Sequence, residues 1–355
     1  MYKWKDFKKI TTYYNGLIKL DKSEYEIRFS RLKNGILLST MVIDCYTVSF
    51  QIEYEGENNI DYKNIIVSYK DFYETVKKIK GIKELDVIVE NNELILITDK
   101  NISEKVSCNK ILTRDFVAEN TSKVNISSFK NAFLFSDNCA KAGIYEFDKN
   151  FVIRIEENHL YLNSYNRGIY VGNKIDIKDG DSISFKIDYA HSSMIKKWLK
   201  YASDPVKGIL SDDLSLEIFK SYLRFSISHI SLILPISREN VDLISEKYKD
   251  LTDFQYPMKE SVNLKIINQC YEAAKAEKVA NVELNDIFHE KSFISRPMFC
   301  NLIDLLEDFD VESFVVNSKD LILEFKIELE TLKTKILLFA MTPKNQLGEI
   351  EDQNI

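Results

Sequence analysis

The side chains that most often act as catalysts or metal ligands are scattered through this 355-residue sequence. No partner motif accompanies any of the four histidines, which are His159, His191, His229 and His289. No CxxC pair occurs among the five cysteines, which are Cys45, Cys108, Cys139, Cys270 and Cys300. Neither a zinc site nor a disulfide framework is therefore expected. The acidic segment Asp176–Asp181 is too short for a calcium loop and lacks the closing glutamate, so we interpret it as a turn.

Searches for sequence motifs of catalysis also find none. The sequence contains no GxxxxGK[ST] or GxGxxG loop that could hold phosphates, and no HExxH or GxSxG motif. We therefore expect no enzyme activity, no metal and no cofactor. An enzyme of another α+β class, using scattered Asp and Tyr residues, stays open as an alternative, and paired carboxylates in a pocket would favour it.

Basic side chains, in contrast, gather on segments with helical periodicity. They include Lys5, Lys8 and Lys9; Lys70, Lys77, Lys78 and Lys80; Lys130 and Lys141; Lys196, Lys197 and Lys200; and Lys265, Lys275 and Lys278. Such faces could contact phosphates although the net charge is −7. The simpler interpretation is a solvated helix face, because lysine favours helices. The last predicted helix supports this simpler interpretation, because its polar face carries the acidic residues Asp304, Glu307 and Asp308.

Apolar residues recur at helical spacing in six segments. The predicted helices are Asp6–Ile18, Ser68–Lys80, Ser127–Ala140, Tyr189–Ala202, Asn263–Lys278 and Arg296–Phe309. Ser68 and Ser127 stand where an N-cap is expected.

An alternating strand, a polar turn and a second strand recur along the chain. The copies are Tyr25–Leu38, Asp86–Leu96, Phe151–Leu162, Glu312–Leu323 and, more weakly, Val206–Leu216. Alternation around Asn-Gly or Asn-Asn predicts β-hairpins. The spacing of the copies indicates six units, with one copy missing or eroded near residue 268. Helices followed by antiparallel hairpins predict an α+β fold, with helices on one face of a curved sheet.

Length and composition set the remaining bounds. A chain of 41.4 kDa exceeds one usual core, so two or three domains are expected. The content of 45% hydrophobic and 29% charged residues is that of a globular protein. The sequence has no apolar run of membrane-spanning length and no signal peptide at Met1, so we expect a soluble, cytoplasmic protein without a membrane partner.

Three segments resemble one protein family, the bacterial DNA polymerase III beta subunit or sliding clamp. Ile65–Ile79 with Asp86–Thr98 is similar to the second half of the family's first domain. Ser127–Val171 is similar to the start of its second domain, and Ile336–Pro343 to its closing strand. The resemblance runs from about residue 25 to residue 345 and agrees with the count of six units.

This resemblance implies a DNA-clamp fold of three similar domains, each built from two helix-plus-antiparallel-sheet units. The implied domains are residues 1–118, 119–238 and 239–345, the last shortened, followed by a polar C-terminal tail at 346–355. In the family, two chains close into a ring whose hole is lined by helices. The protein would then be a non-enzymatic processivity factor for DNA replication, with duplex DNA, a polymerase, a clamp loader and a second copy as partners.

The resemblance also implies site residues. Sequence-independent contact with DNA phosphates would fall to Lys8, Lys9, Lys77, Lys78, Lys80, Lys130, Lys141, Lys196, Lys197, Lys200, Lys265 and Lys275. A hydrophobic pocket for partner peptides would be lined by Ser164, Asn166, Arg167, Gly168, Ile169, Tyr248, Leu251, Phe254, Met341, Thr342 and Pro343.

The sequence departs from the family pattern at several places. Tyr165 and Asn166 replace the Asp-Gly of the family's turn, and Lys249 replaces a proline. The third domain lacks the hairpin due near residue 268, and Gln346–Ile355 extends past the usual end. A clamp-fold protein without ring closure, acting as an interaction or regulatory module, is therefore the alternative to a sliding clamp.

Overall fold

The structure is a computed structural model. It describes the chain outside residues 19–20, 33–34, 55–64, 111–117, 142–149, 167, 179, 205–210, 240, 242–259, 262–263, 278, 307–308, 310–312, 318–320 and 343–355. The chain divides into two compact units. Unit 1 comprises Met1–Thr121 and Ser193–Pro235, and unit 2 comprises Ser122–Ser192 and Ile236–Ile355.

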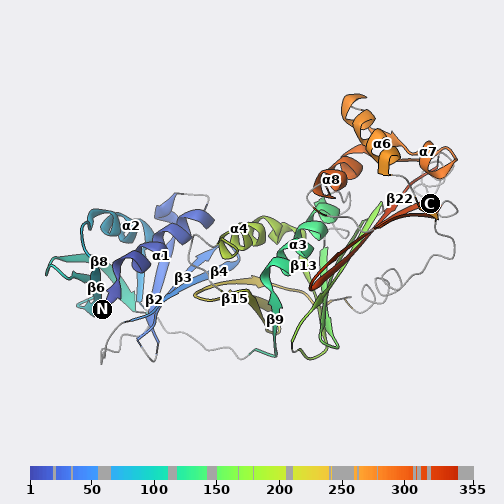
Figure 1. The fold of residues 1–355 in the computed structure, drawn as a ribbon. Helices are drawn as coiled ribbons and strands as arrows, with labels where there is room; N and C mark the ends of the chain where they lie inside the picture. Colours follow the sequence, from blue (N-terminus) through green and yellow to red (C-terminus); the bar gives the residue numbers. More distant parts are fainter. Residues whose placement is uncertain are drawn as a thin grey trace, which may run out of the picture. The chain divides into compact units, whose positions relative to one another are not determined.

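Unit 1 places three helices on one side of a sheet (Figure 1). The helices are α1 (Trp4–Leu17), α2 (Tyr69–Lys78) and α4 (Ser192–Ala202), with a short 3-10 helix η1 (Lys22–Glu24). The strands are β1 (Tyr2–Lys3), β2 (Glu26–Arg31), β3 (Leu37–Ile43), β4 (Tyr46–Ile52), β5 (Ile65–Ser68), β6 (Glu84–Glu90), β7 (Glu93–Thr98), β8 (Ser103–Lys110), β14 (Asp213–Ile218), β15 (Tyr222–Ile227) and β16 (Ile230–Pro235). With β9 (Asn120–Asn125) at its end, the sheet runs β1-β6-β7-β8-β5-β2-β3-β4-β16-β15-β14-β9.

Aromatic side chains fix the order of the helices in unit 1. Tyr69 of α2 donates a hydrogen bond to the Thr11 carbonyl of α1, with an O–O distance of 3.1 Å. Trp198 of α4 donates its indole N–H to the Tyr13 hydroxyl of α1, at 3.1 Å. The helix α1 therefore lies between α2 and α4, and its buried tyrosines hold the helix layer on the sheet. Burial raises the pKa of Tyr13 well above its usual range, so this hydroxyl stays protonated.

Unit 2 contains an eight-stranded sheet and a short two-stranded one. The helices are α3 (Ile126–Lys141), the 3-10 helix η3 (Tyr189–His191), α6 (Leu264–Glu277), α7 (Asn285–Phe288) and α8 (Arg296–Leu306). The larger sheet runs β13-β10-β11-β12-β22-β21-β20-β17 and the smaller one β18-β19. Their strands are β10 (Asn150–Glu156), β11 (His159–Asn166), β12 (Ile169–Asp176), β13 (Ile183–Asp188), β17 (Glu260–Ser261), β18 (Asn281–Glu283), β19 (Phe293–Ser295), β20 (Ser313–Asn317), β21 (Ile322–Leu329) and β22 (Leu332–Phe339).

A buried polar network attaches α3 to the larger sheet. The Asn173 amide nitrogen donates to the Ser136 hydroxyl at 2.9 Å, to the Leu162 carbonyl at 2.8 Å and to the Ala132 carbonyl at 3.3 Å. Its oxygen accepts a hydrogen bond from the Thr334 hydroxyl at 2.8 Å. One side chain therefore joins α3, β11, β12 and β22, and a satisfied buried network of this kind favours one arrangement of the core.

The six predicted helices are all present, and the mixture of helices and antiparallel sheets confirms the predicted α+β class. Ser68 caps α2 as predicted, since its hydroxyl accepts the Asp71 backbone N–H at 3.4 Å. The prediction of Ser127 as a cap is wrong. Asn125 accepts the Ser128 backbone N–H at 3.0 Å, because the helix begins one residue earlier, at Ile126.

Four of the hairpins that we predicted are present as β2–β3, β6–β7, β10–β11 and β20–β21. Of the copy predicted at Val206–Leu216, residues 206–210 lie outside the described residues, and the described part differs in register from the prediction. Leu214 lies in the first strand of the hairpin β14–β15, and the turn comes later, where the Phe219 N–H bonds the Tyr222 carbonyl. In the described residues, five units follow the order strand, helix, three strands, whereas the unit around α6 has only the strand β18 and the short helix α7 after its main helix.

Two sheet junctions join strands that lie far apart in the sequence. Strand β4 pairs with β16, and β12 pairs with β22, both antiparallel. The three domains expected from the sequence stay a prediction, because each sheet continues across one of their boundaries. Among the described residues, no helix combines the length and the apolar character needed to cross a membrane.

Candidate nucleic-acid and partner-binding surfaces

Most of the predicted DNA-contacting lysines of unit 1 reach solvent. Lys77 and Lys78 form the last turn of α2 and are exposed, as is Lys200 of α4. Lys8 and Lys80 are also exposed, whereas Lys9, Lys196 and Lys197 are half-buried. Because α1, α2 and α4 bury their apolar faces against the sheet, these cations lie on the polar faces of one helix layer.

Some of these lysines already have partners inside unit 1. The Lys9 ammonium is 2.9 Å from the Asp6 carboxylate one turn earlier, and Lys8 lies over the Trp4 ring. Lys197 donates to the Leu17 carbonyl at 3.5 Å, at the end of α1. The Asp6 carboxylate offsets part of the positive charge of α1, so α2 and α4 carry the stronger case for phosphate contact.

In unit 2, the predicted lysines lie on α3 and α6. Lys141 and Lys265 are exposed, and Lys130 is half-buried. Lys275 is 3.0 Å from the Asp304 carboxylate of α8 and lies over the Tyr271 ring. Hydrogen bonds with Tyr271 and Asp304 raise the pKa of Lys275, and the Tyr271 hydroxyl lowers the pKa of Asp304. Lys275 therefore serves a contact between helices.

The predicted turn of the partner pocket lies between β11 and β12. Asn166 is buried, and its amide nitrogen donates to the Cys139 carbonyl of α3 at 2.6 Å. Its amide oxygen accepts the backbone N–H groups of Gly168 at 2.9 Å and Ile169 at 3.1 Å. Asn166 thus fixes the turn and attaches it to the end of α3, a role that a short Asx-type side chain performs well.

The C-terminal wall lies beside this turn. Ile169 pairs with Leu338 across β12 and β22, and the Phe339 N–H donates to the Gly168 carbonyl at 2.9 Å. Two residues later, Met341 exchanges two backbone hydrogen bonds with Phe293 at the start of β19, at 2.9 and 3.0 Å. The structure therefore brings the turn and the end of β22 together within unit 2.

Burial divides the predicted pocket residues. Ser164, Asn166 and Ile169 are buried, with 0–2% exposed surface, whereas Gly168, Met341 and Thr342 are half-buried. Arg167, Tyr248, Leu251, Phe254 and Pro343 lie outside the described residues. The pocket assignment as a whole stays a prediction.

The sequence prediction missed an aromatic pair at this site. Tyr165 and Phe339 are half-buried, their rings meet edge to face at 6.5 Å, and both pack against a buried cluster that includes Tyr170 and Leu337. The available signal was strand alternation, because Tyr165 opposes Tyr170 across the hairpin and Leu337 opposes Tyr170 across β12–β22. This pair leaves a partly exposed apolar surface beside the turn.

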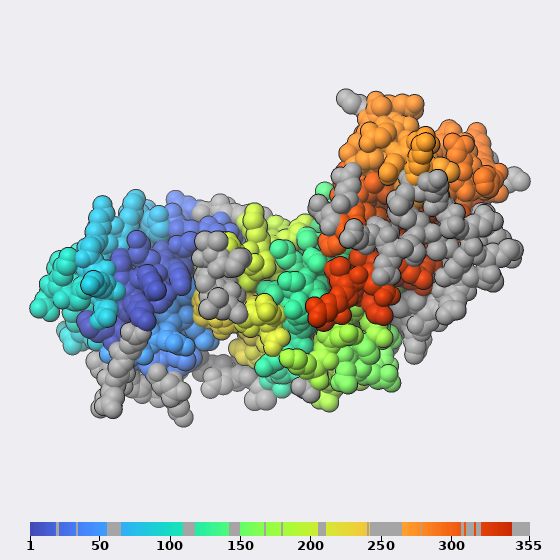
Figure 2. Space-filling view, in the orientation of Figure 1, coloured from blue at the N-terminus to red at the C-terminus, as the bar shows by residue number. Residues whose placement is uncertain are grey.

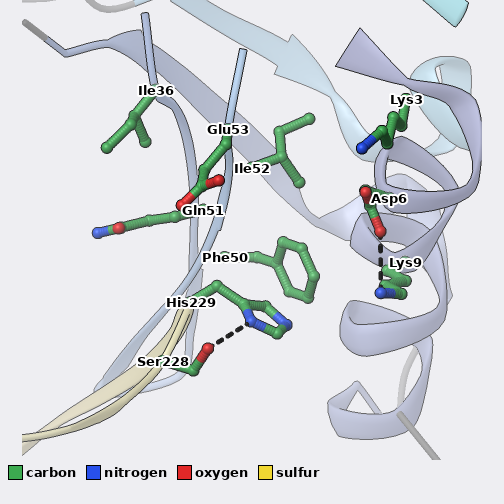
Figure 3. A pocket seen from close by; sticks show the side chains of 10 residues that line it. All are labelled: Lys3, Asp6, Lys9, Ile36, Phe50, Gln51, Ile52, Glu53, Ser228 and His229. Atoms are coloured by element: carbon green, nitrogen blue, oxygen red, sulfur yellow. Dashed lines mark hydrogen bonds and ion pairs between the residues drawn. The ribbon is translucent and has the colours of Figure 1, made fainter. Parts of the chain in front are cut away.

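Unit 1 holds a cavity of about 480 Å³ beside the β4–β16 junction (Figure 3). His229 lines it, stacks edge to face on Phe50 at 4.7 Å and shares a hydrogen bond of 3.0 Å with Ser228. Its other ring nitrogen is buried and has no hydrogen-bond partner among the residues that the structure describes. Burial, and then the nearby Lys9, lower the pKa of His229. The opposite wall carries the Asp6–Lys9 pair.

The described residues contain no group of three His, Cys, Asp or Glu side chains able to hold a metal ion. Cys108, Cys139 and Cys300 are buried, Cys270 is half-buried and Cys45 is exposed.

Comparison with known proteins gives a clear result for the fold alone. No protein-family model matches this sequence, and no curated protein matches it either. Solved structures do match. The beta clamp of Helicobacter pylori bound to a DNA ligase peptide aligns at a TM-score of 0.65, with 10% identity, over 96% of this chain and 99% of that chain.

Two further structures give the same result. The DNA polymerase III subunit beta of Pseudomonas aeruginosa aligns at a TM-score of 0.64 with 9% identity, over 96% of this chain and 98% of that chain. A putative DNA polymerase III beta subunit of Eubacterium rectale aligns at 0.65 with 13% identity, over 96% and 97%. This chain has the beta-clamp fold. The clamp fold predicted from the sequence is thus confirmed, and the residues that perform any function in it must be argued from this structure.

Proposed function

We propose that this protein is a DNA sliding clamp, a ring of two chains that encircles duplex DNA and tethers a replicative polymerase for processive synthesis. It would act without catalysis, as a processivity factor, and a clamp loader would be a further partner. The beta-clamp fold over nearly the whole chain supports the proposal. The exposed lysines on the helix layer of unit 1 are the observation that carries it. Sequence-independent binding of DNA needs positive side chains that contact the phosphates, and it needs no contacts with the bases.

Peptide capture is the second part of the proposal. The H. pylori clamp binds a DNA ligase peptide, and this chain has the same fold. Here the turn fixed by Asn166, the end of β22 and the half-buried Tyr165–Phe339 pair would take the apolar anchors of a partner peptide.

Charge reversal tests the DNA contact. Lys77, Lys78, Lys196 and Lys200 changed together to Glu should weaken binding to a short duplex at least tenfold, measured by fluorescence anisotropy. The slope of log affinity against log salt should fall by about one for each phosphate that the variant no longer neutralises. A matched control reverses Lys3, Lys83, Lys100 and Lys220, four exposed lysines of unit 1 outside the helices. Equal losses in both variants, or no loss in the first, would contradict the assignment.

Ring closure needs a separate test. After incubation with a nicked circular plasmid, a closed ring should stay on the circle in high salt and leave when the plasmid is linearised. Equal salt sensitivity on circle and linear DNA would favour the alternative, a clamp-fold interaction module without ring closure. One observation supports that alternative: the described chain between α6 and β19 holds only β18 and the short helix α7.

A further inference from the structure

The larger sheet of unit 2 turns one face toward α3 and the other face away from it. Phe133 of α3 packs against Phe151 of β10 with the ring centroids 4.8 Å apart, and Asn173 of β12 donates a hydrogen bond to Ser136 of α3. Helix α3 lies along this side of the sheet (Figure 1). Because successive side chains of a strand point to opposite faces, the residues next to Phe151 and Asn173 lie on the second face.

Basic residues of this second face line up across six strands. The register places two adjacent rows of cross-strand neighbours there: Ser184, Arg154, Tyr161, Lys174, Lys333 and Glu328 in one row, and Lys186, Val152, Asn163, Gly172, Lys335 and Lys326 in the other. Strands β13, β10, β12 and β21 each contribute one basic residue and β22 contributes two, against the single carboxylate of Glu328 in these rows. We call the two rows the basic band.

Two pairs of lysines in the basic band face each other directly. Lys174 is opposite Lys333 across β12 and β22, and Lys335 is opposite Lys326 across β22 and β21. Like charges directly opposite each other destabilise a sheet. An anion that lies across these strands would remove the repulsion, so the positions of the four lysines favour anion binding rather than stability of the sheet.

Carboxylates beside these cations compensate only part of their charge. The Glu328 carboxylate is 3.7 Å from Lys333, with 46% and 65% of the side chains exposed, and exposed ion pairs of this kind are weak. Glu324 is 3.1 Å from Lys326. Lys174 has no carboxylate partner in the part of the chain that the structure describes. The middle of the basic band therefore stays positive.

Tyr161 lies in the basic band between two cations. The Arg154 guanidinium is 4.6 Å from the centroid of its ring, and the Lys174 ammonium is 5.8 Å from it. Tyr161 is half-buried, so part of the side chain reaches solvent. Proteins hold single-stranded nucleic acid with this combination, because the cations contact the phosphates and the aromatic ring stacks on a base. An acidic peptide would use the cations alone.

The basic band is accessible along one of its rows. Val241 packs with Val152, Tyr170 and Leu337 in a buried cluster, which covers the side of the band toward Leu337. Lys333 lies in the other row, toward solvent. Six strands at about 4.8 Å spacing make the band about 24 Å long, enough for a few nucleotides. Figure 2 shows red residues of β22 and green residues of the neighbouring strands at the surface of unit 2.

We propose that the basic band binds single-stranded nucleic acid, with the phosphates at Lys174, Lys333 and Lys335 and a base stacked on Tyr161. The backbone of the nucleic acid would run across the strands of the sheet, where cations recur from strand to strand. Stacking accepts every base, so this binding needs no particular sequence. The inference goes beyond the proposed function, which assigns duplex DNA to the helices of unit 1 and not to a sheet face of unit 2.

Fluorescence anisotropy with a short labelled oligothymidylate tests the inference. The protein used is the full chain with Lys77, Lys78, Lys196 and Lys200 changed to Glu, so that the helix layer of unit 1 contributes little. In this background, Lys174→Gln together with Lys333→Gln should lower the affinity at least fivefold. The slope of log affinity against log salt should fall by about 1.4, since each phosphate contact on a single strand contributes about 0.7.

A matched control changes Lys123 and Lys291 to Gln, two exposed lysines of unit 2 outside the basic band. It should leave the affinity unchanged. The urea midpoint of Lys174→Gln with Lys333→Gln, followed by circular dichroism, should not fall, because the change removes two opposed like charges. A loss of binding would then not come from unfolding.

Stacking has its own test at Tyr161. In the same background, Tyr161→Leu should lower the affinity for oligothymidylate at least fivefold with an unchanged salt slope, whereas Tyr161→Phe should bind like its parent. Equal binding by the Leu and Phe variants would overturn the stacking contact and with it the assignment to nucleic acid.

Three other results would also overturn the inference. They are no binding of oligothymidylate in the background, an equal loss in the lysine pair and its control, and binding of poly-L-glutamate in place of oligothymidylate with the same dependence on Lys174 and Lys333. The last result would assign the band to an acidic protein segment. In an otherwise wild-type chain, Lys174→Gln with Lys333→Gln should bind a short duplex like wild type. Loss of wild-type duplex binding alone would therefore remove the proposed function, and loss of single-strand binding alone would remove this inference.

Discussion

The buried Asn173 network gives the sharpest prediction about the scaffold of the proposed partner site. Asn173→Leu keeps the size of the side chain but removes three donated hydrogen bonds and the one accepted from Thr334. The hydroxyls of Ser136 and Thr334 would lose this partner in a buried site. Each unsatisfied buried group costs about 1–3 kcal/mol, part of which the added apolar surface offsets, so we expect a loss of about 2–4 kcal/mol in the free energy of unfolding of unit 2.

Asn163 supplies a matched control one strand away. Asn163 is 5% exposed and Asn173 1%, but the amide oxygen of Asn163 is buried and finds no hydrogen-bond partner in the described part of the chain. Asn163→Leu removes that unsatisfied oxygen, and we expect a change of less than about 1 kcal/mol. The identical substitution at two buried asparagines thus isolates the hydrogen-bond network from side-chain volume.

Two spectroscopic signals separate the units during urea denaturation. Both tryptophans, Trp4 and Trp198, belong to unit 1, so tryptophan fluorescence reports that unit, whereas far-UV circular dichroism reports both. Asn173→Leu should lower the dichroism midpoint and leave the fluorescence midpoint in place. Equal midpoints for the Asn163 and Asn173 variants would refute the reasoning, because the network would then contribute nothing beyond packing.

Further predictions concern the helix caps and one histidine. Ser68→Ala should lower the free energy of unfolding of unit 1 by about 1 kcal/mol, seen as a lower urea midpoint in fluorescence. Asn125→Ala should lower the free energy of unfolding of unit 2 by a similar amount, seen in the dichroism signal alone. Ser127→Ala should change little. The pKa of His229 in the folded protein is below its ordinary value of about 6.5, so the folded state favours the neutral ring. The stabilisation that comes from the neutral ring is complete above about pH 6.5 and is lost as the pH falls through the lower folded pKa. The melting temperature of unit 1, followed by fluorescence, should therefore drop more between pH 7 and pH 5 in wild type than in His229→Gln; parallel curves would contradict this cause.

The sequence by itself determined the local elements. Apolar residues at helical spacing predicted all six main helices, and alternation around Asn-rich turns predicted four hairpins in their observed places. These patterns are local, since a helix face or a strand face is visible within one segment. The shift at Leu214 shows the limit: two Asp residues before it resembled a turn, and only the pairing of β14 with β15 set the register.

The tertiary structure decided which segments meet. The pairing of β4 with β16 and of β12 with β22 joins residues far apart in the sequence, and strand partners over such distances leave no periodic signal. Two of the predicted lysines, Lys9 and Lys275, are paired with carboxylates. Helical spacing could not reveal the partner of Lys275, because Asp304 lies on another helix. The contacts of the turn residue Asn166 and of the aromatic pair Tyr165 and Phe339 likewise depend on how the sheets join. Sequence patterns specify which face of an element is buried, and only the assembled sheets decide what lies against that face.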